Sequence, residues 1–115
     1  MNVEELRDYC VAKPGASESL PFDEDTLVFK VGGKIFALFG VSDSPLTINL
    51  KCDPEKAISL REEYAAVKPG YHMNKRLWNT VTVNQVKAKL VCEWIDHSYD
   101  LVVESLPKKI KSELS

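Results

Sequence analysis

Residues 26–51 carry the pattern that most restricts the fold of this chain. Through 26–31, Leu27, Phe29 and Val31 fall on one face, and through 46–51 apolar and polar side chains alternate, at the two-residue period of a β-strand with unlike faces. Gly32-Gly33 supplies the positive φ angles that a two-residue hairpin turn requires. The pattern predicts an antiparallel sheet with one buried face and one face in water. In the returning strand, it predicts that Ile35, Ala37 and Phe39 share one face, opposite Phe36 and Leu38.

The helices that could cover the buried face are marked by caps and breaks. Asn2 and Glu5 fit an N-terminal capping box, and Asp53-Pro54 fits an N-cap followed by proline in the first turn. A third helix is predicted from apolar residues at helical spacing between about 86 and 107. The fold class is therefore predicted to be α+β, a two-layer sandwich of an antiparallel sheet covered by helices. The other predicted segments are a polar loop over 16–21, strands over 26–31, 34–39, 46–51 and 77–83, and a loop over 71–76.

Size and composition favour one domain in the cytoplasm. A chain of 115 residues has the usual length of one domain, so we expect a single domain over 1–115, with 108–115 as a frayed basic tail after Pro107. No apolar run approaches the roughly 20 residues that span a bilayer, and the acidic start does not resemble a signal peptide. The three cysteines form no Cys-x-x-Cys pair. We expect a monomer with reduced, mostly buried thiols and no membrane contact.

Charge is distributed unevenly along the chain. The net charge of -2 argues against a dedicated nucleic-acid-binding protein, which usually carries a strong positive charge. Residues 64–92 nevertheless contain no acid. A cationic loop with an aromatic side chain beside it suits phosphate contact and base stacking. The bases of this segment are Lys68, Lys75, Arg76, Lys87 and Lys89.

Three stretches of the sequence resemble a known family. Pro21-Phe22 with the strand–turn–strand 28–37 resembles the signature of the MmcQ/YjbR-like proteins, and so do 67–81 and 98–109. The most specific stretch reads Pro-Gly-Tyr-His-Met-Asn-Lys-Arg-Leu-Trp-Asn-Thr. The resemblance covers nearly the whole chain. It implies a compact α+β fold similar to that of CyaY and frataxin, and a DNA-binding role with a double-wing arrangement.

These observations predict weak, salt-dependent DNA binding centred on the basic loop. Because neighbouring strand residues point to opposite faces, one of Trp78 and Asn79 is expected to face solvent. The hypothesis requires the five cations of 64–92 to lie together in space with no carboxylate between them. The candidate contact residues are Lys34, Lys68, Tyr71, His72, Asn74, Lys75, Arg76, Trp78 and Asn79.

Other functions remain open from the sequence. The same face could bind an acidic protein partner, whose identity the sequence does not give, or a small anion. Clustered carboxylates are ligands for hard cations, and frataxin-like proteins hold iron on such residues, but no iron-site motif carries over to this chain. We therefore predict no metal site and no cofactor. The carboxylates concerned are Glu4, Glu5, Asp8, Glu18, Asp23, Glu24 and Asp25.

A catalytic role has little support in the sequence. His97 follows Cys92 by five residues, which is off the helical spacing that would bring the two side chains together. No pair of carboxylates stands out as a general acid and base. We therefore expect no catalytic residues and a protein that is not an enzyme.

Overall fold

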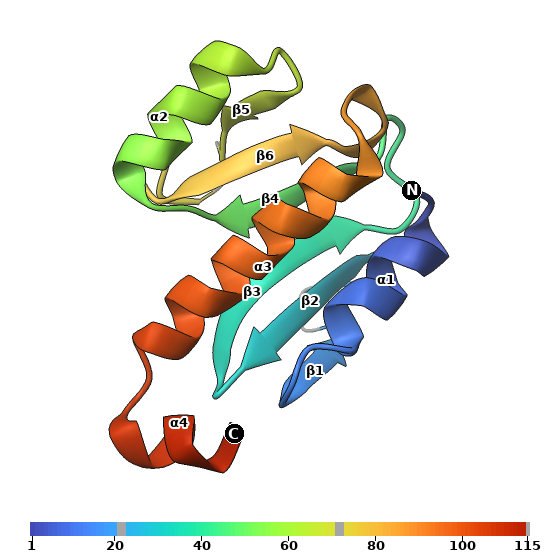
Figure 1. Ribbon diagram of the computed structural model, residues 1–115. Helices are drawn as coiled ribbons and strands as arrows, with labels where there is room; N and C mark the ends of the chain where they lie inside the picture. The colour runs from blue at the N-terminus through green and yellow to red at the C-terminus, as the bar shows by residue number, and fades with distance from the viewer. Residues whose placement is uncertain (21–22, 71–72, 115) are drawn as a thin grey trace.

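The computed structural model describes residues 1–20, 23–70 and 73–114, and a six-stranded antiparallel sheet organises them. The strands lie in the order β1-β2-β3-β4-β6-β5, and every neighbouring pair is antiparallel. Helices α1, α2 and α3 lie on one face of the sheet (Figure 1). The elements are α1 (Val3–Val11), β1 (Ala16–Ser19), β2 (Thr26–Val31), β3 (Lys34–Gly40), β4 (Thr47–Lys51), α2 (Pro54–Glu63), β5 (Val67–Pro69), β6 (Trp78–Thr82), a 3-10 helix (Val83–Gln85), α3 (Ala88–Glu104) and α4 (Lys108–Leu114).

The core lies between the sheet and the helix layer. In β4, Ile48 and Leu50 are buried against the helices, while the alternate residues of that strand are only half-buried on the opposite face. The long helix α3 lies across the middle of the sheet and buries Val91 and Ile95 in the same core (Figure 1). The predicted two-layer α+β sandwich is therefore confirmed.

The local signals of the sequence are confirmed as well. The Oδ1 atom of Asn2 accepts a hydrogen bond from the Glu5 N–H at 2.8 Å, and Glu5 returns one to the Asn2 N–H at 3.1 Å. Asp53 caps α2 by accepting from the Lys56 N–H at 3.2 Å. Gly32 and Gly33 have φ angles of 58° and 82°, as the hairpin turn requires.

Strand β3 departs from the predicted alternation. Phe29 lies opposite Ala37 and Lys30 lies opposite Ile35, so Phe36 is an extra residue and forms a β-bulge. The bulge buries both Phe36 and Ala37 in the core, where the Phe36 ring meets the edge of the Tyr99 ring at 5.3 Å. The prediction that Phe36 faces away from Ala37 is therefore wrong, and so is the prediction that Ile35 shares a face with Ala37, since Ile35 lies opposite Lys30 on the outer face.

Two short edge strands were not predicted. The segment 16–19, predicted to be part of a polar loop, is strand β1, and Val67–Pro69, for which no element was predicted, is strand β5. Each is held by main-chain pairing with one neighbour, β1 with β2 and β5 with β6. Neither is long or apolar enough to show the period of a strand in the sequence.

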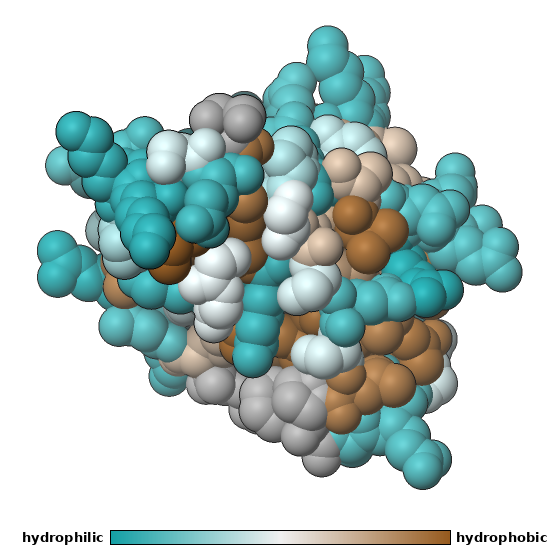
Figure 2. All heavy atoms as spheres, turned by 90° about the horizontal axis from the view of Figure 1, so that it is seen from below, coloured by the Kyte–Doolittle hydropathy of each residue, from teal (hydrophilic) through white to brown (hydrophobic). Residues whose placement is uncertain are grey.

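The C-terminal segment is a helix and not the frayed tail that was predicted. Ile110 and Leu114 of α4 are four residues apart, on one side of the helix, and both pack against the core. Leu114 lies next to Gly15, so the end of the chain contacts the turn after α1. Figure 2 views the molecule from the end where α4 lies and shows apolar surface between hydrophilic side chains.

No helix in the described part of the chain has both the length and the apolar character needed to cross a membrane.

Candidate nucleic-acid interface

Cross-strand pairing brings two lysines onto the outer face of the sheet, the face opposite the helices. Asn49 of β4 lies opposite Thr80 of β6, which lies opposite Lys68 of β5. In the next row, Lys51 lies opposite Trp78. The Thr80 hydroxyl donates a hydrogen bond to Asn49 Oδ1 at 2.5 Å, which joins β4 and β6 within the first row. The side chains that these three strands direct outward include no acid; they are Thr47, Asn49, Lys51, Lys68, Trp78, Thr80 and Thr82.

The loop before β6 carries two more cations, next to the end of β4 that holds Lys51. Asn74 Oδ1 accepts from the Arg76 N–H at 3.0 Å, and the Asn74 carbonyl accepts from the Trp78 N–H at 2.9 Å. These bonds close the loop against the start of β6 and leave Lys75 and Arg76 exposed beside it. We call the resulting set the outer basic surface: Asn49, Lys51, Lys68, Asn74, Lys75, Arg76 and Thr80.

Arg61 of α2 anchors this loop from the helix side. Its Nε donates to Asn79 Oδ1 at 2.6 Å, and its Nη2 donates to the Trp78 carbonyl at 3.2 Å and to the Lys75 carbonyl. One guanidinium therefore joins α2, β6 and the loop. The planar fork of arginine suits this geometry because it presents several donors at fixed angles.

Trp78 and Asn79 do not belong to the outer basic surface. Trp78 points outward but is only 9 % exposed, and Asn79 points toward the helices and is 2 % exposed. The Gly70 backbone packs against the Trp78 Cβ, and its N–H donates to the Trp78 carbonyl at 2.8 Å. The expectation that one of the two would face solvent is therefore wrong, because strand alternation sets the face on which a side chain lies but not how far neighbouring residues cover it.

Two other predicted contacts lie elsewhere or outside the described residues. Lys34 lies at the β2–β3 hairpin, where its Nζ donates to the Ser105 hydroxyl at 3.3 Å at the end of α3. It is thus tied to the helix layer and not to the β5–β6 loop. Tyr71 and His72 fall outside the described residues, as do Pro21 and Phe22 of the family signature.

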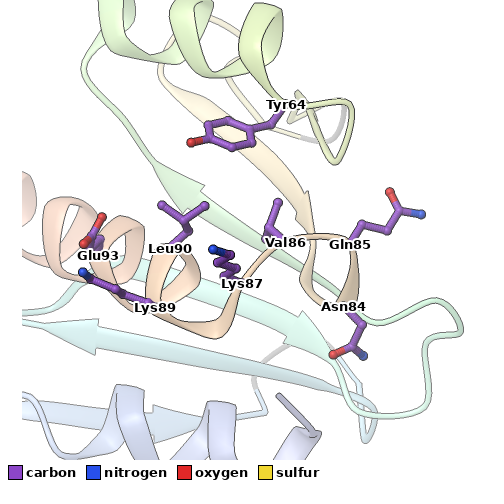
Figure 3. A pocket seen from close by; sticks show the side chains of 8 residues that line it. All are labelled: Tyr64, Asn84, Gln85, Val86, Lys87, Lys89, Leu90 and Glu93. Carbon is purple, nitrogen blue, oxygen red and sulfur yellow. The ribbon is translucent and has the colours of Figure 1, made fainter.

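Lys87 and Lys89 lie apart from the other three cations of 64–92. They line an open groove of about 760 Å³ at the start of α3, with Tyr64 facing Val86 and Leu90 across it (Figure 3). Glu93 lines the same groove, so its cations are partly balanced by a carboxylate. The predicted single cluster of five cations is therefore wrong, and the DNA-binding site predicted from residues 64–92 alone is not formed. A basic surface remains only where Lys68, Lys75 and Arg76 are joined by Lys51 of β4. The residues that line the groove are Tyr64, Asn84, Gln85, Val86, Lys87, Lys89, Leu90 and Glu93.

Several of the acidic candidates have structural partners. Glu18 pairs with Arg7, whose guanidinium lowers the pKa of the carboxyl group. Asp23 accepts from the N–H groups of Asp25 and Thr26, at 2.8 and 2.6 Å, and these bonds lower its pKa. Within residues 1–20, 23–70 and 73–114, no group of three or more His, Cys, Asp or Glu side chains is arranged to hold a metal ion.

His97 and Cys92 take part in different contacts on α3. The Nε2 atom of His97 accepts a hydrogen bond from the Asp53 N–H at 3.2 Å, at the start of α2. Cys92 lies on the side of α3 near Tyr9 and Asp96, and burial raises the pKa of its thiol. A raised thiol pKa lowers the fraction of nucleophilic thiolate.

The stability of the protein is expected to fall when His97 becomes protonated. Burial is the main cause that lowers the pKa of His97, and nearby Lys56 lowers it further, against the opposing carboxylates of Asp53 and Asp100. Below a pH of about 6.5, the ordinary histidine pKa, the unfolded chain therefore binds more protons than the folded one. The histidine's contribution to stability is complete above that pH and is lost as the pH falls toward the folded-state pKa.

Urea unfolding of the parent and of His97→Gln at pH 7.5 and 5.5 measures this effect. We expect the parent to lose more stability than the variant over this interval. An equal loss in both proteins would assign the pH dependence to other groups.

Sequence and structure comparisons give consistent results. A family model described as YjbR matches residues 11–101. The uncharacterized protein YbdF of Escherichia coli O157:H7 is 41% identical over 90 residues, covering 77% of this chain and 74% of that protein. The uncharacterized protein YjbR of Escherichia coli K12 is 34% identical over 110 residues, covering 95% of this chain and 93% of that protein.

Two crystal structures are similar over most of the chain. The Deinococcus radiodurans protein DR2400, which has a DUF419 domain, superposes with a TM-score of 0.92 and 40% identity, over 98% of this chain and 87% of that one. A Pseudomonas syringae protein superposes with a TM-score of 0.76 and 31% identity, over 89% of this chain and 99% of that one.

Proposed function

This chain belongs to the YjbR family, and we propose that it is a cytoplasmic protein that binds DNA weakly through the outer basic surface. The observation that carries the proposal is the pairing of β4, β6 and β5. This pairing aligns Lys51 and Lys68 on one face, beside the loop that holds Lys75 and Arg76. Such a surface suits phosphate groups because it combines cations with amide donors, and the side chains that β4, β6 and β5 direct outward include no carboxylate.

The spacing of the cations supports contact with one polyanion. The strands that carry Lys51 and Lys68 are separated by β6, so the strand axes lie roughly 10 Å apart. This separation is close to the Debye length of about 8–10 Å at moderate salt, so both charges act on the same stretch of backbone. Neither lysine forms an ion pair within the described part of the chain. Both are therefore available to replace counterions on DNA.

Few cations and a net charge of -2 set the expected strength of binding. Each phosphate that a lysine or arginine neutralises releases condensed counterions, and the observed affinity falls accordingly with salt. A surface with four cations makes few such contacts, so binding is expected to be weak at physiological salt and readily measured at low salt.

Replacing both lysines tests the proposal. We expect Lys51→Gln with Lys68→Gln to lower DNA affinity about ten-fold at low salt and to reduce the slope of log K against log salt by roughly 1–2. Fluorescence anisotropy with a labelled oligonucleotide at several salt concentrations measures both quantities.

The matched control is Lys87→Gln with Lys89→Gln, which removes the same charge from the groove at the start of α3. It should leave the affinity within about two-fold, apart from the general effect of net charge. Equal losses in both double variants would show that only net charge matters. A parent protein that retains no DNA at low salt would exclude the function.

A further inference from the structure

A hollow opens on the outer face of the sheet beside the outer basic surface. Its volume is about 350 Å³, within the range of pockets that hold small ligands or parts of larger ones. Asn49, which belongs to the outer basic surface, forms part of its wall, and Met73 lies two residues before Lys75. The lining residues are Thr26, Ile35, Leu38, Phe39, Gly40, Asp43, Asn49 and Met73.

The chemistry of the hollow differs from that of the cations next to it. Ile35, Leu38 and Met73 are apolar, so these parts of the wall favour a group that leaves water. The polar lining includes the Asp43 carboxylate, which repels a phosphate but accepts hydrogen bonds from N–H donors. The hollow is therefore suited to an uncharged group with N–H donors and not to the DNA backbone.

Asn49 adds a donor to this wall. Its Oδ1 accepts a hydrogen bond from the Thr80 hydroxyl, so the amide NH₂ is the part of the side chain that can donate a hydrogen bond to a ligand. A carboxylate acceptor and an amide donor in one apolar hollow can together read the hydrogen-bonding edge of a nucleobase.

We propose that this hollow receives one unstacked base of a single-stranded nucleic acid whose phosphates lie on the outer basic surface. The inference rests on the proposed function and specifies the form of its ligand. In a duplex each base is stacked and its pairing edge is occupied, so only a single strand presents a base at low cost. Asp43 favours guanine, because the pairing edge of guanine carries adjacent N–H donors that a carboxylate can accept together.

Anisotropy measurements with three labelled ligands of equal length test this assignment. The ligands are an oligo-dT, the same strand with one central dG, and a duplex. We expect the parent to bind the dG-containing strand about ten-fold more tightly than the duplex, which corresponds to the burial of one base. The oligo-dT should bind with intermediate affinity.

Two variants separate the hollow from the cations. Leu38 is half-buried on the outer face, so Leu38→Trp fills the hollow without adding charge. It should reduce single-strand affinity to the level of the duplex and leave duplex affinity within about two-fold. Asp43→Asn should lower the affinity for the dG-containing strand to about that of oligo-dT, because an amide cannot accept both N–H donors of guanine. The affinity for oligo-dT and for the duplex should stay equal or rise, because one repelling charge is gone. Asp43 is exposed and the change to asparagine is isosteric, so this variant is expected to fold normally. It therefore tests the hollow even if Leu38→Trp folds poorly.

The possible failures are distinguishable. Equal binding of single strand and duplex by the parent, with no effect of Leu38→Trp, would overturn the hollow as a base site and leave the proposed function intact. No binding of any of the three ligands at low salt would overturn both.

Discussion

Replacing Arg61 with alanine is expected to lower the free energy of unfolding by about 3 kcal/mol, since hydrogen bonds from a charged donor contribute about 1.5–3 kcal/mol each and their loss leaves the buried Asn79 Oδ1 unpaired. The carbonyls of Trp78 and Lys75 lose the same donor, although the Trp78 carbonyl keeps the Gly70 N–H and Lys75 is exposed. Asn79 is 2 % exposed, so water cannot easily replace the lost donor. The change therefore weakens the contact between α2 and β6 and releases the basic loop.

Urea unfolding and thermal melting measure this loss, which corresponds to a decrease in Tm of roughly 10–20 °C for a domain of this size. Arg7→Ala is a matched control, because Arg7 pairs with Glu18 at the surface, where such ion pairs contribute about 0–1 kcal/mol. Arg61→Lys should lie between the two, since an ammonium group cannot reproduce the planar fork. If Arg61→Ala and Arg7→Ala proved equally mild, the anchoring role of Arg61 would be refuted.

Replacing Ser98 with alanine is expected to cost about 2–4 kcal/mol, because each buried polar group left without a partner costs about 1–3 kcal/mol. The Ser98 hydroxyl, on α3, donates to the Phe36 carbonyl at 2.5 Å and accepts from the Lys51 N–H at 2.9 Å. Both main-chain groups lie at the bulge of β3, where the extra residue interrupts the regular pairing with the neighbouring strands. Ser98 is fully buried, so a single hydroxyl completes the hydrogen bonding of the sheet at this point.

Amide hydrogen exchange at Lys51, together with urea unfolding, tests this role. We expect Ser98→Ala to speed the exchange of the Lys51 N–H relative to its neighbours in β4. Ser17→Ala, at an exposed position of β1, should change neither quantity. Unchanged exchange at Lys51 in Ser98→Ala would show that another group satisfies this N–H.

Local signals explain why much of the fold could be predicted from the sequence. The Asn2 and Asp53 caps, the Gly32-Gly33 turn and the alternation of 46–51 each depend on residues that are neighbours in the chain. The features that were missed depend on distant partners. β1 and β5 exist because a longer strand pairs with them, and the bulge at Phe36 is completed by a serine 62 residues away.

The candidate site could be predicted only in part for the same reason. The alternation of apolar and polar residues in 46–51 predicts that Lys51 lies on the solvent-facing side of the sheet. Its nearness to Lys68, however, depends on the strand order β4-β6-β5, which no local pattern gives. Conversely, Arg76 and Lys87 are close in sequence, yet the five residues of β6 extend roughly 17 Å between them. Sequence distance along the basic segment therefore misled the prediction of one cluster.

Mapping the contact surface by NMR tests the central claim most directly. A ¹⁵N-labelled sample titrated with a short oligonucleotide at low salt reports which backbone amides change environment. We expect the largest shifts at Lys51, Lys68, Thr80 and the loop 74–76, with little change at 87–90. Shifts concentrated at 87–90, or none anywhere, would contradict the assignment of DNA binding to the outer basic surface.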